Sequence, residues 1–136
     1  MDIAIREIQN TDFEDIIDYW TNPAEEIGRV RSNIVDKNPT REEILSSLEK
    51  KLGSDKPTLL MVAIDGKLIG MHTITALTSE SAEIHAHYWD VNYIGKGFGK
   101  VSGLKAGKIF MESHGLKYLY LNNVTTFIAR TYVGEI

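Results

Sequence analysis

Two strand-forming runs on either side of the dipeptide Asp65-Gly66 place the strongest constraint on the fold. Residues 58–64 and 67–77 are rich in β-branched and apolar side chains, which favour extended structure. An Asp-Gly pair tolerates the left-handed backbone conformations that a two-residue hairpin turn requires. The sequence therefore predicts two neighbouring antiparallel strands in the middle of the chain.

Helix and strand signals on both sides of this hairpin predict the rest of the fold. Further strands are expected over residues 2–9, 82–90 and 116–121. Helices are expected from Asp12, with Asn10-Thr11 as the cap, from the capping box formed by Thr40 and Glu43, and over residues 100–113. This order indicates an α/β (α+β) domain with a mixed, mostly antiparallel sheet flanked by helices.

Composition narrows the class of protein. The longest apolar run, Leu59 to Ile64, has six residues, whereas a membrane span needs roughly 20. The N-terminal residues lack a basic region followed by an apolar stretch, so we expect one cytoplasmic domain over residues 1–136. A net charge of −4 gives no indication of nucleic-acid binding, and the absence of Cys argues against a thiolate metal site. We therefore expect no metal, no nucleic acid and no membrane.

A glycine-rich loop lies between the strand expected at 82–90 and the helix that follows it. Its sequence is Gly95-Lys96-Gly97-Phe98-Gly99-Lys100. Glycines allow consecutive backbone N–H groups to point into one concavity, and the start of a helix adds a positive field. The loop is therefore a candidate site for phosphate oxygens, with two lysines as additional positive charges.

The common nucleotide-binding motifs do not fit this loop. A Walker A loop that ends at Gly99-Lys100 would need Gly at the position of Ile94, and Ser or Thr at the position of Val101. A Rossmann fingerprint would need Gly at position 100, and its βαβ context is missing. Both interpretations are rejected.

The stretch from Asp90 to Gly99 resembles the signature of the GCN5-related N-acetyltransferase (GNAT) family. That signature joins a strand to a helix through Asp-Pro-x-x-Arg/Gln-Gly-x-Gly-x-Gly/Ala. The Asp and all three glycines match here, whereas Val91 replaces the Pro and Ile94 replaces the Arg or Gln. The order of expected elements over residues 2–121 also resembles the family.

The resemblance implies an N-acetyltransferase that moves an acetyl group from acetyl-coenzyme A (acetyl-CoA) to a primary amine of a small molecule or peptide. It implies that the loop N–H groups hold the pyrophosphate and that the pantetheine arm lies where the preceding strand splays from the next one. The implied pantetheine-binding residues are Trp89, Asp90 and Val91. The implied phosphate-binding residues are Gly95, Lys96, Gly97, Phe98, Gly99 and Lys100.

Acetylation of an amine needs a base for the ammonium proton. Alternation along the strand places Glu83, His85, His87 and Trp89 on one face. The family uses either a Glu or a His-x-His pair on this strand, so Glu83 and His85 are the candidate bases. We expect structural roles for His87 and His72.

The resemblance also implies a tyrosine acid after the fifth strand, for which Tyr132 is the candidate. The β-branched residues before it favour a strand, so residues 132–136 resemble the family's sixth strand after a shortened helix. Two alternatives stay open at this C-terminus: the last strand is missing, or a partner chain completes the sheet in a homodimer.

The acceptor amine is expected to bind near the first helices. The residues available there are Trp20, Glu25, Glu26, Arg29 and Arg31. A second hypothesis keeps the fold but not the catalysis. On that hypothesis the chain is a non-catalytic GNAT-like module that binds CoA or serves as a dimeric scaffold, which the replacement at Ile94 favours.

Overall fold

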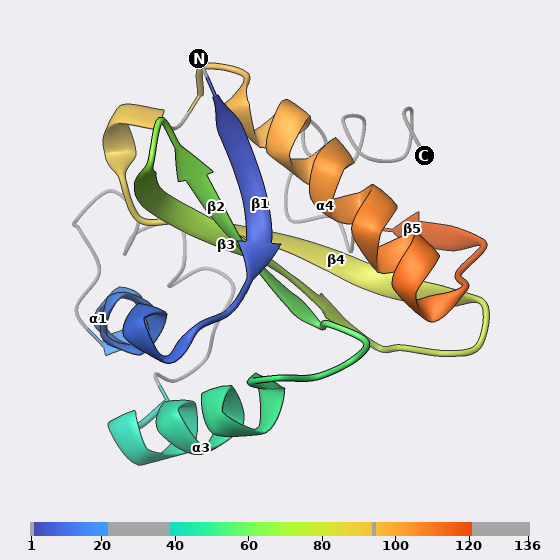
Figure 1. Ribbon diagram of the computed structural model, residues 1–136, viewed down its shortest axis with the longest axis horizontal. Helices are drawn as coiled ribbons and strands as arrows, with labels where there is room; N and C mark the ends of the chain where they lie inside the picture. The colour runs from blue at the N-terminus through green and yellow to red at the C-terminus, as the bar shows by residue number, and fades with distance from the viewer. Residues whose placement is uncertain (1, 22–38, 94, 121–136) are drawn as a thin grey trace.

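The computed structural model describes residues 2–21, 39–93 and 95–120. Within these residues a five-stranded sheet has the order β1-β2-β3-β4-β5 (Figure 1). Its strands are β1 (Ile3–Glu7), β2 (Leu59–Ile64), β3 (Lys67–Thr75), β4 (Ser81–Tyr88) and β5 (Tyr118–Tyr120). The first four strands pair antiparallel, and β4 pairs with β5 in parallel. The predicted mixed, mostly antiparallel sheet is confirmed.

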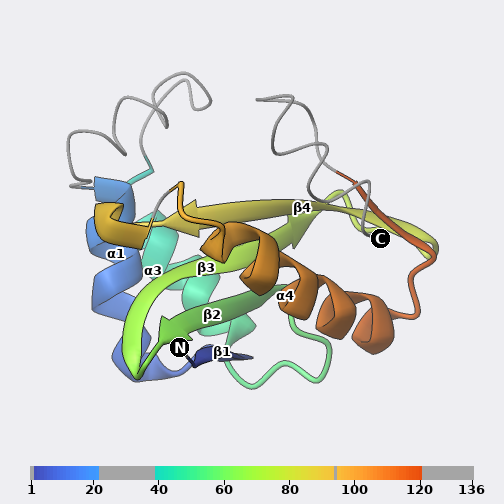
Figure 2. The same cartoon turned by 90° about the horizontal axis from the view of Figure 1, so that it is seen from above.

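In the part of the chain that the structure describes, three α-helices accompany the sheet: α1 (Phe13–Thr21), α3 (Arg41–Lys51) and α4 (Phe98–His114). Two short 3-10 turns, η1 (Asn10–Asp12) and η2 (Val91–Tyr93), precede α1 and α4. In both views α1 and α3 lie together, and the strands separate them from α4 (Figure 1, Figure 2). None of the helices described is long and apolar enough to cross a membrane.

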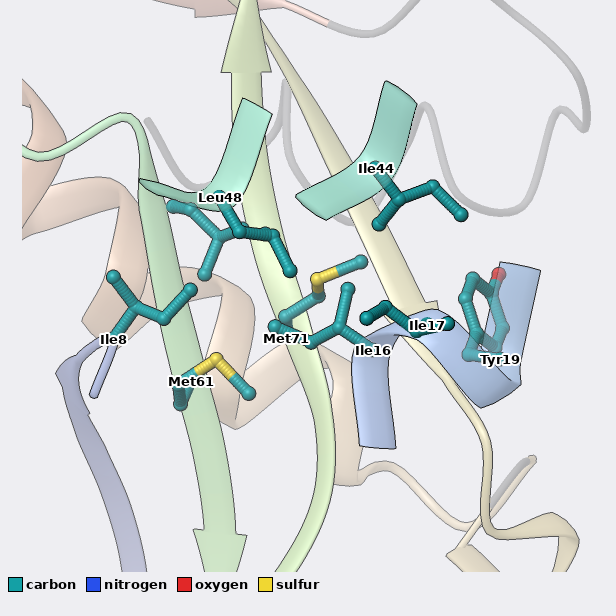
Figure 3. Packing of buried hydrophobic residues seen from close by; sticks show 9 residues of the cluster. Ile8, Ile16, Ile17, Tyr19, Ile44, Leu48, Met61 and Met71 are labelled. Carbon is teal, nitrogen blue, oxygen red and sulfur yellow. The ribbon is translucent and has the colours of Figure 1, made fainter. Parts of the chain in front are cut away.

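Alternation along the strands divides the core into two faces. Met61 of β2 and Met71 of β3 pack against α1 and α3, and Figure 3 shows Ile16, Ile17 and Leu48 gathered around them. The residues that alternate with these along the strands face the opposite side of the sheet. On that side Leu60, Ile74 and Ile84 pack against Ala106 and Phe110 of α4. The sheet is therefore covered by helices on both sides, and each face can carry a different half of a site.

The predicted helix starts are confirmed at α3 and wrong in detail at α1. Thr40 and Glu43 form the expected capping box, with bonds of 3.2 and 3.1 Å. Before α1, however, residues 10–12 form η1, and its cap is Gln9, whose N–H donates to Asp12 at 2.8 Å. Arg6 of β1 also donates two bonds of 2.8 Å to the same carboxylate. The reason for the difference is this ion pair across the turn, which fixes Asp12 before the helix begins.

The hairpin at Asp65-Gly66 is confirmed, since both residues have positive φ angles of 50° and 83°. A bulge follows on β3, where Gly70 pairs with Val62 and Leu68 pairs with Ala63, so Ile69 is the additional residue. At this bulge β3 and β4 approach closely. A Cβ atom placed on Gly70 would lie 2.3 Å from the carbonyl oxygen of His87.

We expect Gly70→Ala to lower the free energy of unfolding by about 2 kcal/mol, because the new methyl group meets backbone that cannot move aside. Urea denaturation measures the change. Gly99→Ala is the matched control, since its Cβ would have its nearest neighbour at 3.9 Å. Equal stability of the two variants would contradict the close approach of β3 and β4.

Candidate active site

A row of titratable side chains runs along β4 on the face of α1 and α3. Glu83, His85 and His87 pair with Thr75, Thr73 and Met71 of β3 in turn. His85 Nε2 lies 3.8 Å from Glu83 Oε1 and 2.8 Å from the hydroxyl of Thr75. The two histidine rings stack with centroids 6.2 Å apart. The structure therefore brings together the two candidate bases that the period of the strand placed on one face.

His87 is held by α1 and β3. Its Nδ1 lies 3.1 Å from the hydroxyl of Tyr19, and its Nε2 lies 3.5 Å from that of Thr73. The ring centroid of Trp20 is 5.2 Å from that of His87, and the ring centroids of Trp89 and Tyr19 are 5.9 Å apart. Sequence reasoning assigned a structural role to His87, and it did not single out Tyr19.

A cavity of about 520 Å³ lies between α1, α3 and the sheet. It is lined by Ile16, Trp20, Pro39, Glu43, Ile44, Ser47, Leu48, Lys51, Leu59, Met71, Thr73, Ile74, Thr75 and His87. His87 thus lines the cavity directly, whereas His85 reaches it through its hydrogen bond to Thr75. The expected acceptor residue Trp20 is part of the wall. Glu25, Glu26, Arg29 and Arg31 lie outside the described residues.

Sequence reasoning missed the contribution of α3 to this cavity. Glu43, Ser47 and Lys51 follow one another at intervals of four residues, which places them on one helix face. This spacing was a usable signal, because the apolar residues Ile44 and Leu48 mark the adjoining buried face. The helix therefore contributes both packing and polar groups to the wall.

The glycine loop forms an open cradle at the start of α4. Gly95 and Gly97 have φ angles of 77° and 86°, and Gly97 is the N-cap. A Cβ atom on either glycine would meet no atom within 4 Å. The first turn of α4 contains no acidic residue, and Lys96 and Lys100 are exposed beside it. The loop thus offers space, backbone donors and positive charge to an anionic group.

The other residues assigned to the loop have structural partners. The Phe98 ring packs against Tyr93 at 5.4 Å, so its contribution to the cradle is its backbone. Asp90 forms an ion pair of 2.7 Å with Lys67 and accepts a bond of 3.0 Å from the N–H of Asn92, the residue after Val91. The bond from Lys67 holds the pKa of Asp90 below its ordinary value. Asp90 therefore fixes the η2 turn beside the hairpin, and Ile94 lies outside the described residues.

Within the described residues, β5 pairs with β4 along Ser81 to Glu83. The N–H of Trp89 donates to Ile69 of β3 at 3.0 Å, so the backbone groups of alternate residues, Ala86 and Tyr88, point to the opposite edge. In the described part of β5 the pairing ends at Glu83 and Tyr120. The backbone groups of Ala86 and Tyr88 thus lie on the side of β4 away from β3, directly before the predicted Trp89, Asp90 and Val91.

A buried polar group lies on the α4 face of the same strands. His72 has an exposed fraction of 0%, and its Nε2 lies 2.9 Å from the hydroxyl of Ser102. That hydroxyl also bonds the hydroxyl of Tyr88. Burial lowers the pKa of His72 to about 4, and a hydrogen bond to the backbone of His85 opposes the shift only in part. His72 is therefore a neutral structural group that ties β3 to α4.

Comparison with known proteins identifies the family. The sequence matches the acetyltransferase (GNAT) family over residues 5–129. The chain belongs to the GNAT family of acetyltransferases. No curated protein matches the sequence. Within the described residues, no group of three or more His, Asp and Glu side chains could hold a metal ion.

Several solved GNAT structures share the fold at low sequence identity. A GNAT acetyltransferase from Bacillus anthracis is 16% identical over 99% of this chain and 78% of its own, with a TM-score of 0.71. A spermidine N-acetyltransferase from Vibrio cholerae, in complex with CoA and spermine, is 19% identical over 88% and 69%, with a TM-score of 0.70. An N-acetyltransferase from Campylobacter jejuni, in complex with acetyl-CoA, is 20% identical over 98% and 86%, with a TM-score of 0.61.

The buried His72 makes stability depend on pH. Its pKa of about 4 in the folded chain lies below the ordinary 6.5, so the unfolded chain binds more protons between these values. We expect stability to be highest above pH 6.5 and to fall by about 3 kcal/mol towards pH 4 from this group alone.

Urea denaturation at pH 7.5 and pH 5 measures how much unfolding free energy is lost at the lower pH. We expect His72→Gln to lose less than wild type, because it lacks the titrating group. His85→Gln, on the neighbouring strand and partly exposed, is the control and should show the same loss as wild type. If His72→Gln lost as much stability as wild type, the pH dependence would not arise from His72.

Proposed function

We propose that this GNAT chain transfers the acetyl group of acetyl-CoA to the primary amine of an acceptor that binds in the cavity under α1 and α3. The observation that carries the proposal is the position of β4. One end of this strand leads into the open glycine loop, its His87 lines the cavity, and its His85 bonds the lining residue Thr75. A donor bound at the loop and an acceptor in the cavity would therefore meet along a single strand.

The loop residues suit the phosphates of CoA. The N–H groups of residues 95–100 and the positive end of α4 would hold the pyrophosphate, with Lys96 and Lys100 as counter-charges. The backbone groups of Ala86 and Tyr88, which point away from β3, would pair with the pantetheine arm. Acetyl-CoA supplies the activated thioester, and every protein group needed to place it belongs to β4 or to the loop.

The row on β4 supplies the proton chemistry. The acceptor ammonium first loses a proton to Glu83 or His85, which share the face and lie 3.8 Å apart. The neutral nitrogen then attacks the thioester carbonyl carbon, so a C–N bond forms, the C–S bond breaks and the nitrogen releases its second proton to solvent. The departing CoA thiolate takes up a proton. We propose Tyr132 as its donor, as the family resemblance implies; this residue lies outside the described part of the chain.

The first test concerns the cradle. Gly97→Glu should abolish binding of CoA, because a carboxylate would fill the concavity and repel the pyrophosphate. Isothermal titration calorimetry with CoA measures the affinity. Gly53→Glu is the matched control, since Gly53 has a similar φ of 72° and equally open surroundings but ends α3. Unchanged affinity in Gly97→Glu would rule out the loop as the phosphate site.

The second test concerns the base. Glu83→Gln or His85→Gln should lower kcat by about 10²-fold, the usual effect of losing a general base, with less loss at high pH, where the free amine is more abundant. Affinity for CoA should stay unchanged, because neither side chain lies at the loop. Glu80→Gln, an exposed carboxylate just before β4, is the control.

The outcomes of this second test separate the two functional hypotheses. Wild-type rates in both variants would show that the base lies elsewhere or that the amine arrives neutral. Binding of CoA without turnover of any amine would favour the non-catalytic module.

A further inference from the structure

The cavity contains a half-buried cation. Lys51 is the last residue of α3 and lines the cavity, and its Nζ donates a bond of 3.2 Å to the hydroxyl of Thr58. Burial lowers the pKa of the Lys51 ammonium group. No carboxylate in residues 2–21, 39–93 or 95–120 forms an ion pair with it. A cation removed from water with only a hydroxyl as partner gains most from an anionic group in the cavity.

The acidic residue of the wall does not provide that anion. Glu43 lies eight residues before Lys51 on α3, which corresponds to about 12 Å along the helix axis. Its Oε1 accepts the N–H of Thr40 in the capping box at the far end of the helix. The positive charge at Lys51 is therefore available to a bound ligand.

The cation and the hydrogen-bond partner of a proposed base line the same cavity. Lys51 and Thr75 are both part of its wall, and the hydroxyl of Thr75 lies 2.8 Å from His85 Nε2. An anion at Lys51 and an amine near His85 can therefore belong to one bound molecule. A small molecule that carries both groups fits this arrangement.

The remaining wall is mostly apolar. Ile44 and Leu48 of α3, Met71 of β3 and Ile16 of α1 line the cavity and belong to one packed cluster (Figure 3). Its volume of about 520 Å³ is within the usual range for small-molecule sites. An apolar side chain could be buried here while the charged end of the molecule faces β3 and the end of α3.

We propose that the acceptor is an α-amino acid with an apolar side chain, whose carboxylate pairs with Lys51 and whose amino group faces Glu83 and His85. This inference rests on the proposed acetyltransferase function and narrows its substrate class. The α-amino nitrogen forms the new C–N bond and gives its proton to the base, and the products are an N-acetylamino acid and CoA. A polyamine, which carries only positive charges, would be repelled by Lys51.

The test compares each amino acid with the amine that lacks its carboxylate. The purified chain is assayed with acetyl-CoA and two matched pairs of acceptors. The first pair is L-leucine and 3-methylbutylamine, and the second is L-phenylalanine and 2-phenylethylamine. We expect kcat/KM to be at least about tenfold higher for the amino acids, the effect of one charge-assisted hydrogen bond. Lys51→Gln should remove this preference through KM, and Lys51→Arg should restore it. Lys50→Gln is the matched control, because Lys50 lies in the same helical turn but is exposed.

A binding measurement gives the same comparison without turnover. Calorimetry with the CoA-saturated protein should show tighter binding of N-acetyl-L-leucine than of N-(3-methylbutyl)acetamide, and Lys51→Gln should equalise the two. Equal kcat/KM values or equal affinities in the wild type would overturn the amino-acid assignment while the acetyltransferase function stands. Failure of the proposed function is a different result, in which the chain neither binds CoA nor acetylates any amine.

Discussion

The antiparallel pairing of β3 with β4 determines where every part of the candidate site lies. Its register sends Glu83, His85 and His87 to the face of α1 and α3, and sends Ile84 and Tyr88 to the face of α4. The same register brings the chain beyond β4 to the hairpin, where the ion pair of Asp90 with Lys67 fixes the turn before the glycine loop. A shift by one residue would exchange the two faces, so the proposed base would lose the cavity and the core would lose its contact with α4.

Local signals were sufficient for most of the fold and for half of the site. Asp65-Gly66 predicted the hairpin, Thr40 and Glu43 predicted the start of α3, and alternation predicted the face shared by Glu83 and His85. In each case the determining interaction joins residues that are close in sequence. The glycine loop belongs to the same class, because the left-handed backbone at Gly95 and Gly97 is a property of the loop itself.

The features that sequence reasoning missed depend on contacts between distant segments. Tyr19 orients His87 across 68 positions of the chain. The hydroxyl of Ser102 on α4 meets the ring of His72 on β3, which lies 30 positions earlier. The position of Lys51 in the cavity depends on how α3 crosses the sheet, which no local pattern encodes.

The distance between the loop and the base constrains the form of the donor. From Glu83 to Tyr88, β4 covers roughly 17 Å at about 3.4 Å per residue, and the glycine loop lies beyond Tyr88. A small phosphate compound bound in the cradle could not bring its reactive carbon to Glu83. A donor held there by its phosphates must carry the reactive group on an extended arm, and that arm needs hydrogen-bonding partners along its path. The backbone groups of Ala86 and Tyr88 point away from β3 along the path from the cradle to Glu83, so we propose them as these partners.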